Sequence, residues 1–180
     1  MKTVGDILGA FSVPAARPGF NHTEENGEFA IELVTEQSFP GFWKILYFYP
    51  RDFSVVCPTE IVGFSELVDA FTERNAVVLG GSVDNEYVKL AWRRENVQLR
   101  SLNHYSFGDT KGDLVDQLGI RDQRAGVALR ATFIIDPENV IQHVAVNNLA
   151  VGRSPQETLR VLDALQTGEL CDCNRPLGGV

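Results

Sequence analysis

Two apolar runs, separated by a segment with helical spacing, most constrain how this chain can fold. Residues 43–49 (WKILYFY) are apolar and rich in aromatic side chains, and they lie between Pro40-Gly41 and Pro50. Residues 76–83 (AVVLGGSV) form the second run. Short apolar runs bounded by turn residues are typical of buried β-strands. The sequence therefore predicts two buried strands.

The segment between these runs carries apolar residues at helical spacing. They are Ile61, Phe64, Leu67, Val68 and Phe71. This period predicts one helix from about Pro58 to about Asn75. Proline fits the first turn of a helix, where its missing N–H is no loss. A strand–helix–strand unit is almost always right-handed, so we expect the helix to cover one face of the sheet.

The rest of the chain continues the alternation of strands and helices. Residues 14–28 are polar and turn-rich, which predicts a loop. Further strands are expected at 29–36, 105–108, 129–135 and 140–146, and further helices at 85–99, at 113–118 and from the Ser154 capping box to about Gln166. This order predicts an α/β fold with a central mixed sheet flanked by helices.

The composition is that of an ordinary globular protein and argues against several functions. The chain has 180 residues and a net charge of −8, and no Lys/Arg run is longer than Arg93–Arg94. Binding to nucleic acid or to an anionic membrane is therefore not expected. No stretch approaches the roughly 18 apolar residues of a membrane span. Gly5 and Asp6 interrupt the N-terminal segment, so we expect a cytoplasmic protein without a signal peptide.

The chain has three cysteines, Cys57, Cys171 and Cys173. An odd and low count in a chain of this length does not fit a disulfide scaffold. In a reducing compartment such cysteines are metal ligands, transient redox centres or inert core residues. A Cys-x-Cys pair without a second pair is poor evidence for zinc. The histidines have no metal-ligand spacing, and we expect neither a metal nor a cofactor. They are His22, His104 and His143.

Cys57 follows the first predicted strand and begins the first predicted helix. The N-terminus of a helix has free N–H groups and a partial positive charge. Both stabilise a thiolate, which is the reactive form of cysteine. The alternative is that Cys57 is a small apolar core residue. Its position alone leaves both interpretations open.

The neighbours of Cys57 strengthen the case for a nucleophile. Pro50 and Pro58 stiffen the chain on both sides, and Ser54 can offer a hydroxyl to the same point. Glu60 could orient a nearby arginine. Taken singly, Ser54 is equally well an ordinary loop serine, and Glu60 a first-turn acid that complements the helix dipole.

Residues 50–60, Pro-x-x-x-Ser-x-x-Cys-Pro-Thr-Glu, resemble the active-site motif of the peroxiredoxin family. Residues 129–136 (LRATFIID) look like the family's later strand, whose arginine reaches the peroxidatic cysteine, and Ala91-Trp92 and residues 168–171 also fit. The resemblance covers residues 3–178. Within the family, the chain most resembles the alkyl hydroperoxide reductase C (AhpC) type of typical two-cysteine peroxiredoxin. Its CDCN tail is similar to that of the three-cysteine subgroup.

The resemblance implies a thioredoxin-like fold with peroxiredoxin-type extensions. It divides the chain into a domain at residues 1–166 and a tail at residues 167–180 that carries the resolving cysteine. It also places Trp92 near the active site, although by pattern alone a tryptophan at this spacing is more often a helix-core residue than a dimer contact.

The resemblance implies the chemistry as well. Cys57 would attack the terminal oxygen of a hydroperoxide and become sulfenic acid. Arg130 would favour the thiolate and hold the peroxide, and Ser54 would stabilise charge on the leaving oxygen. Pro50 would shield the sulfenic acid from water.

The implied partners are a second copy of the chain and a reductase. Cys171 would condense with the sulfenic acid at Cys57 of the other subunit of a homodimer, and dimers would assemble into a decameric or dodecameric ring. A thioredoxin-like or AhpD-like reductase with a Cys-x-x-Cys motif would reduce the disulfide. Cys173 is either a spare thiol of the tail or a relay from the reductase to Cys171.

Two positions depart from the family pattern. Most members have threonine at position 54, and serine keeps the hydroxyl but loses the methyl group that restricts its rotamer. Residues 108–112 are GDTKG, where members that are easily over-oxidised have a Gly-Gly-Leu-Gly insert.

Two other functions compete with the peroxidase hypothesis. A general thiol–disulfide oxidoreductase normally has a second cysteine at position 60, where this chain has Glu60. A ring-forming chaperone that holds unfolded proteins fits the same sequence. Peroxide consumption that is lost in Cys57→Ser, with suppression of aggregation retained, would separate the two roles.

Overall fold

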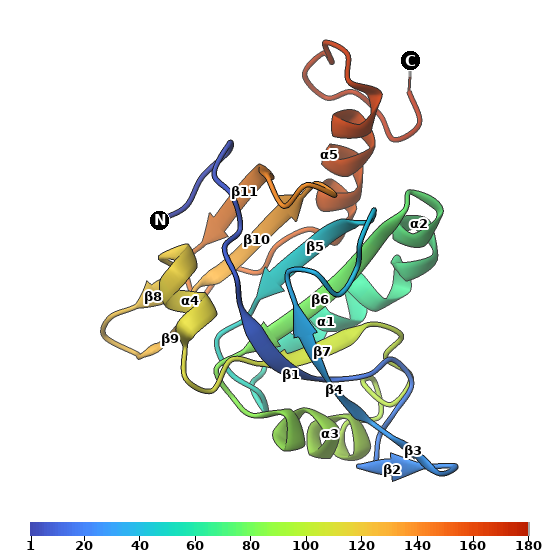
Figure 1. The fold of residues 1–180 in the computed structure, drawn as a ribbon, viewed down its shortest axis with the longest axis vertical. Helices are drawn as coiled ribbons and strands as arrows, with labels where there is room; N and C mark the ends of the chain where they lie inside the picture. The colour runs from blue at the N-terminus through green and yellow to red at the C-terminus, as the bar shows by residue number, and fades with distance from the viewer. Residues whose placement is uncertain (180) are drawn as a thin grey trace.

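The computed structural model describes residues 1–179, which form a seven-stranded sheet flanked by helices (Figure 1). The strands, in spatial order, are β11 (Ile141–Asn147), β10 (Arg130–Ile135), β5 (Trp43–Phe48), β6 (Ala76–Ser82), β7 (Tyr105–Gly108), β1 (Ser12–Ala16) and β4 (Ile31–Thr35). The helices are α1 (Cys57–Glu66), α2 (Val68–Glu73), α3 (Glu86–Glu95), α4 (Asp113–Leu118) and α5 (Pro155–Thr167). Two small two-stranded sheets pair β2 (Glu24–Glu25) with β3 (Glu28–Phe29), and β8 (Arg121–Asp122) with β9 (Val127–Ala128).

The main sheet is mixed. Strands β5, β6 and β7 run parallel, whereas β10 and β11 on one side and β1 and β4 on the other are joined by antiparallel pairings. The connection from β5 to β6 runs through α1 and α2, as expected for a crossover between parallel strands. The predicted α/β fold with a central mixed sheet is confirmed.

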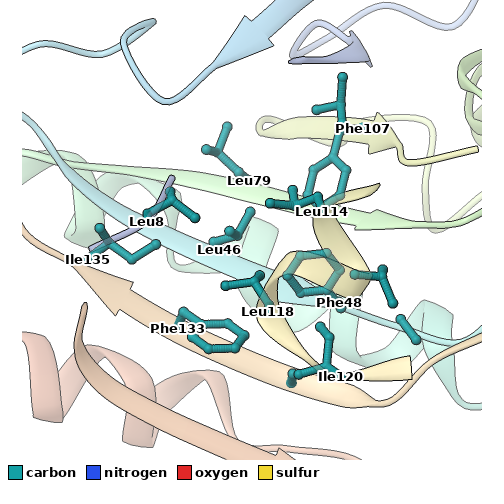
Figure 2. Close-up of a cluster of buried hydrophobic side chains, with 14 of the residues drawn as sticks. Leu8, Leu46, Phe48, Leu79, Phe107, Leu114, Leu118, Ile120, Phe133 and Ile135 are labelled. Carbon is teal, nitrogen blue, oxygen red and sulfur yellow. The ribbon is translucent and has the colours of Figure 1, made fainter. Parts of the chain in front are cut away.

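Alternate residues of β5 enter two separate cores, one on each face of the sheet. Leu46 and Phe48 belong to the core in Figure 2, together with Leu79 of β6 and Leu114 and Leu118 of α4. Each of these side chains is at most 2% exposed. This face of the sheet is therefore covered by α4.

The opposite face of the sheet holds the second core. Ile45 and Tyr47 of β5 meet the apolar sides of α1, α2, α3 and α5 there, including Phe64 of α1 and Leu159 of α5. Cys57 belongs to this core. The fold thus places the candidate nucleophile between the sheet and a helical layer.

Gly80 in β6 gives Tyr47 the space that it occupies. A Cβ atom at position 80 would lie 2.2 Å from the Tyr47 ring, so any larger residue would displace the ring. In this space Tyr47 stacks on Phe64, with 4.1 Å between ring centres, and its hydroxyl lies 2.7 Å from Nε2 of His104. The close approach explains why a strand of this core contains a glycine.

The helix predicted from Pro58 to Asn75 is two helices. The chain leaves α-helical geometry at Leu67 (φ −103°, ψ 5°), whose N–H donates to the carbonyl of Phe64 three residues earlier (3.2 Å). Both Phe64 and Phe71 remain in the same core across this turn. Because the apolar period continues on both sides, residue spacing does not reveal the break.

The segment 14–28, predicted as a loop, contains part of a strand. Residues 14–16 belong to β1, which pairs with β4 along its length and with β7 at Ala15 and Ala16. Residues 24–29 carry the small β2–β3 hairpin. A short run of small residues has no period that predicts such long-range pairings.

The tail that follows α5 turns back on this helix. The Arg175 guanidinium donates to the Asp163 carboxylate (2.7 Å), and the Gly178 N–H donates to the same group (2.9 Å). The hydrogen bond from Arg175 lowers the pKa of Asp163 to about 2. Figure 1 shows the tail at one end of the molecule. Within residues 1–179, no helix is long and apolar enough to cross a membrane.

Candidate active site

Cys57 is the first residue of α1 and is completely buried. The loop that follows β5 leads to it, and Pro58 occupies the first turn of the helix. In the part of the chain that the structure describes, no side chain caps this N-terminus. The partial positive charge of the helix N-terminus therefore acts directly on the thiol.

Arg130 lies beside Cys57. It is the first residue of β10, it is 4% exposed, and its Nη1 atom lies 3.4 Å from the Cys57 sulfur. Its Nε donates to the carbonyl of Leu149 (2.7 Å), and its Nη1 donates to the carboxylate of Glu60. These contacts hold the guanidinium so that it faces the sulfur.

A second arginine, Arg153, binds the other side of the same carboxylate. Its Nε donates to Glu60 (2.9 Å), and its Nη1 donates to the carbonyl of Ala131 (2.6 Å). It also donates to the carbonyl of Phe48 and lies over the ring of Tyr47, 5.5 Å from its centre. The sequence did not point to Arg153, because an arginine just before a helix is usually exposed.

The three charged side chains around Cys57 carry two positive charges and one negative charge. Arg130, Arg153 and Glu60 are all buried, with side chains 5%, 6% and 2% exposed. Excess buried charge is costly unless a group of opposite sign balances it. The contact between Arg130 Nη1 and the Cys57 sulfur (3.4 Å) places one of these positive charges beside the sulfur.

Ser54 and Pro50 lie in the loop between β5 and α1. The hydroxyl of Ser54 donates to the carbonyl of Arg51 (3.0 Å), and within residues 1–179 it forms no hydrogen bond with Cys57. The structure therefore brings Arg130 to the thiol but leaves the Ser54 hydroxyl on the loop backbone.

The loop before Cys57 packs on α3. Phe53 has a left-handed backbone (φ 53°), and its ring stacks on Trp92 with 5.6 Å between ring centres. Trp92 is 4% exposed and shares its core with Cys57. Asp52 forms an ion pair with Lys89 of α3 (2.8 Å). Trp92 is thus both a helix-core residue and a neighbour of the active-site loop.

The other two cysteines lie on the tail. Cys171 and Cys173 are exposed, and all three thiols are free. The Cys171 sulfur lies 3.5 Å from the hydroxyl of Thr167, beside an open hollow of about 700 Å³ that the tail residues line. Because Cys57 is enclosed and Cys171 is exposed, a bond between them requires movement. In residues 1–179 no group of three or more His, Cys, Asp or Glu side chains could hold a metal ion.

The amino-acid sequence of this chain matches a known protein family and is similar to several of its members. Residues 4–144 match the model of the AhpC/TSA family. The alkyl hydroperoxide reductase C of Mycobacterium tuberculosis is 41% identical over 177 residues, which cover 97% of this chain and 90% of the relative. That of Mycolicibacterium smegmatis is 48% identical over 141 residues, with 78% and 72% covered. The mitochondrial thioredoxin-dependent peroxide reductase of Mus musculus is 42% identical over 184 residues, with 96% and 71% covered.

Solved structures have the same fold. Mycobacterium tuberculosis AhpC superposes with a TM-score of 0.88 at 39% identity and covers 97% of this chain and 98% of its own. The reduced 2-Cys peroxiredoxin of Plasmodium vivax also gives a TM-score of 0.88, at 34% identity, with 100% and 92% covered.

The thioredoxin-like fold, the enclosed thiol–arginine site and these likenesses define an enzyme of the peroxiredoxin class, which reduces peroxides. More narrowly, the chain belongs to the AhpC/TSA family, and its relatives are peroxiredoxins of the alkyl hydroperoxide reductase C type. The resemblance drawn from residues 50–60 and 129–136 is confirmed at the level of the family.

Proposed function

We propose that this enzyme reduces hydrogen peroxide and organic hydroperoxides at Cys57 and resolves the oxidised cysteine with Cys171 of the partner subunit. The observation that carries the proposal is the position of Arg130, whose Nη1 lies 3.4 Å from the Cys57 sulfur while Glu60 holds the guanidinium. A thiol at a helix N-terminus beside a fixed cation has the environment of a thiolate nucleophile.

The first step is a two-electron transfer from sulfur to the peroxide. The thiolate of Cys57 attacks the terminal oxygen, an S–O bond forms and the O–O bond breaks. The leaving alkoxide or hydroxide takes a proton and departs as alcohol or water. Arg130 orients the peroxide, while the N–H groups of α1 and the rotated Ser54 hydroxyl stabilise the charge that develops on the leaving oxygen.

The second step forms a disulfide. The thiol of Cys171 attacks the sulfenic sulfur, the S–S bond forms, the S–O bond breaks and water leaves. The burial of Cys57 and the exposure of Cys171 on the tail support a reaction between two subunits, with α1 opening at its first turn. A homodimer is the smallest assembly that permits this step, and we extend the proposal to a decameric or dodecameric ring of such dimers.

The third step restores the two thiols. A thioredoxin-like or AhpD-like reductase attacks the disulfide with one thiol of its Cys-x-x-Cys motif and leaves with the disulfide on itself. The exposed tail is accessible to such a partner, and Cys173, two residues from Cys171, is either a spare thiol or a relay. The cycle needs a reducing compartment, and we place it in the cytoplasm.

The deciding experiment is a titration of the fully reduced protein with hydrogen peroxide, followed by peptide mapping without reduction. We expect one peroxide to be consumed per subunit and one linked peptide pair, which joins the Cys57 and Cys171 peptides. The Cys57→Ser variant is the control and should consume none. Equal consumption by this variant would refute the assignment of Cys57.

A further inference from the structure

Asp52 and Lys89 form a buried ion pair beneath the loop that leads to Cys57. The pairing nitrogen and oxygen lie 2.8 Å apart, and each side chain is 1% exposed. The Lys89 ammonium also donates to the hydroxyl of Ser82 in β6 and lies 5.0 Å from the centre of the Tyr49 ring. One lysine of α3 thus joins the loop to the sheet.

The loop backbone is tied down at the same point. The N–H of Asp52 donates to the carboxylate of Asp84 (2.8 Å), which also accepts from the Ser82 hydroxyl (3.3 Å). The next residue, Phe53, has a left-handed backbone that non-glycine residues seldom adopt, and its ring stacks on Trp92. Two consecutive residues are therefore fixed to β6 and α3.

On the other side of Cys57 the chain is held by Glu60, through its two arginines. Between these anchors lies the segment 54–59. Apart from the contact of Cys57 with Arg130, its side-chain hydrogen bonds are local, from Ser54 to the Arg51 carbonyl and from Thr59 to the Val56 carbonyl. This short segment has to open before the sulfur can meet another cysteine.

We propose that the Asp52–Lys89 pair is a positioning latch for the peroxide reaction, which holds the Cys57 loop closed and delays the exit of the sulfenic acid. The inference rests on the proposed function, and Asp52 and Lys89 act through the loop rather than on the substrate. A sulfenic acid that waits in the closed site can attack a second peroxide, gain a second oxygen and become sulfinic acid, while that peroxide leaves as water or alcohol. The latch therefore favours the first step, but it also increases over-oxidation of Cys57.

The variants that test the latch have to avoid leaving one charge buried alone. Removal of both members of a buried pair is often tolerated, whereas removal of one is strongly destabilising. The double variant Asp52→Asn with Lys89→Met opens the latch in this way. Ser82→Ala is a milder second variant, because it removes a single hydrogen-bonding partner of the pair.

Lys44→Met is the matched control. Lys44 is a buried lysine (2% exposed) at the beginning of β5, whereas the Cys57 loop follows the end of that strand. Its ammonium contacts the carbonyls of Phe42 (3.4 Å) and Asp136 (3.5 Å). Lys44→Met therefore measures the effect of losing a buried lysine while the Asp52–Lys89 pair stays intact.

Hydrogen exchange of the reduced protein tests the latch without any peroxide. Amides of residues 50–59 should exchange about tenfold faster in the double variant and by a smaller factor in Ser82→Ala, because local opening becomes easier. In Lys44→Met they should exchange at the wild-type rate. A folded double variant with wild-type exchange at residues 50–59 would overturn the proposal.

Rapid kinetics then test the consequence. In the double variant we expect sulfenic acid to form more slowly, the disulfide to form faster, and the fraction of Cys57 found as sulfinic acid per turnover to fall several-fold. A purely structural role would slow both steps and leave that fraction unchanged, which would also overturn the proposal. If wild-type protein consumes no peroxide, the proposed function fails, and the exchange experiment still decides whether the latch exists.

Discussion

Arg130 and Glu60 form a buried ion pair, and this pair directs a guanidinium nitrogen at the sulfur of Cys57 from 3.4 Å. Glu60 belongs to the first turn of α1 and Arg130 begins β10, so the pair joins a helix to a strand beside the Cys57 sulfur. The same carboxylate accepts from Arg153 at the start of the segment that enters α5. One acidic side chain therefore fixes three parts of the fold around the thiol.

Arg130→Met should slow the reaction of Cys57 with hydrogen peroxide by about 100-fold or more, because it removes the cation that faces the sulfur and that orients the peroxide in the proposed mechanism. Alkylation of Cys57 by iodoacetamide should also become slower. Arg51→Met is the control, since Arg51 is exposed and, among the described residues, its side chain hydrogen-bonds only to the carbonyl of Ala125 (3.3 Å). If Arg130→Met keeps the wild-type alkylation profile, Arg130 has no part in the site.

Ser54→Ala should lose about 100-fold in kcat/KM for hydrogen peroxide, which is the usual effect of removing one hydrogen bond to a developing charge. Ser54→Thr should retain activity, because threonine keeps the hydroxyl and restricts its rotamer. Relative to wild type, Ser54→Ala loses the hydroxyl that the proposed mechanism uses, whereas Ser54→Thr keeps it and adds a methyl group. Full activity of Ser54→Ala in a steady-state assay would show that the hydroxyl is not needed.

The oxidised protein should migrate as a covalent dimer on a non-reducing gel. Cys171→Ser should remove most of that band or divert the bond to Cys173, and Cys173→Ser should leave the band unchanged. A double variant that lacks both tail cysteines should give no covalent dimer. An oxidised monomer with an internal bridge from Cys57 would contradict the resolution between two subunits.

Arg153→Met should lower the free energy of unfolding by about 3–5 kcal/mol, because it breaks a buried ion pair. The carbonyls of Ala131 and Phe48 lose the same donor. Urea denaturation of the reduced protein measures the change. Arg160→Met is the control, since it breaks an exposed pair on α5 and should cost about 1 kcal/mol or less. Equal losses in the two variants would argue against a structural role of Arg153.

The stability of the protein should fall as pH decreases below about 6.5, in part because of His104. Burial lowers the pKa of His104 to about 3, and Arg93 acts in the same direction. The folded protein therefore keeps this histidine neutral, whereas the unfolded chain protonates it near its ordinary pKa. Its contribution is fully present above pH 6.5 and is lost progressively between about pH 6.5 and pH 3.

The expected change for His104 is about 2 kcal/mol between pH 7 and pH 5. Urea denaturation at the two pH values measures it. His104→Gln is the matched variant, because an amide can keep the hydrogen bond with the Tyr47 hydroxyl but does not titrate. Between pH 7 and pH 5, the free energy of unfolding of this variant should change by about 2 kcal/mol less than that of the wild type. An identical pH dependence in wild type and variant would contradict the assignment.

Local patterns in the chain were enough to predict most strands and helices and to single out a candidate nucleophile. The apolar runs at 43–49 and 76–83 became β5 and β6, because burial of a strand leaves a continuous apolar signature. Cys57 could be singled out because a strand end, two prolines and a helix start surround it in the sequence. The family could be inferred from the same stretch, together with the arginine that begins β10.

The folded chain alone decided which charges surround Cys57 and how its loop is held. Arg153 meets Glu60 across 93 residues, and Lys89 meets Asp52 across 37. Arginine and lysine are mostly exposed, and no local period marks the few that are buried. The sequence did not reveal the break between α1 and α2 at Leu67 for a related reason, because the apolar spacing continues through it. Burial of a charge depends on contacts between distant segments, and such contacts exist only once the sheet and its helices have packed together.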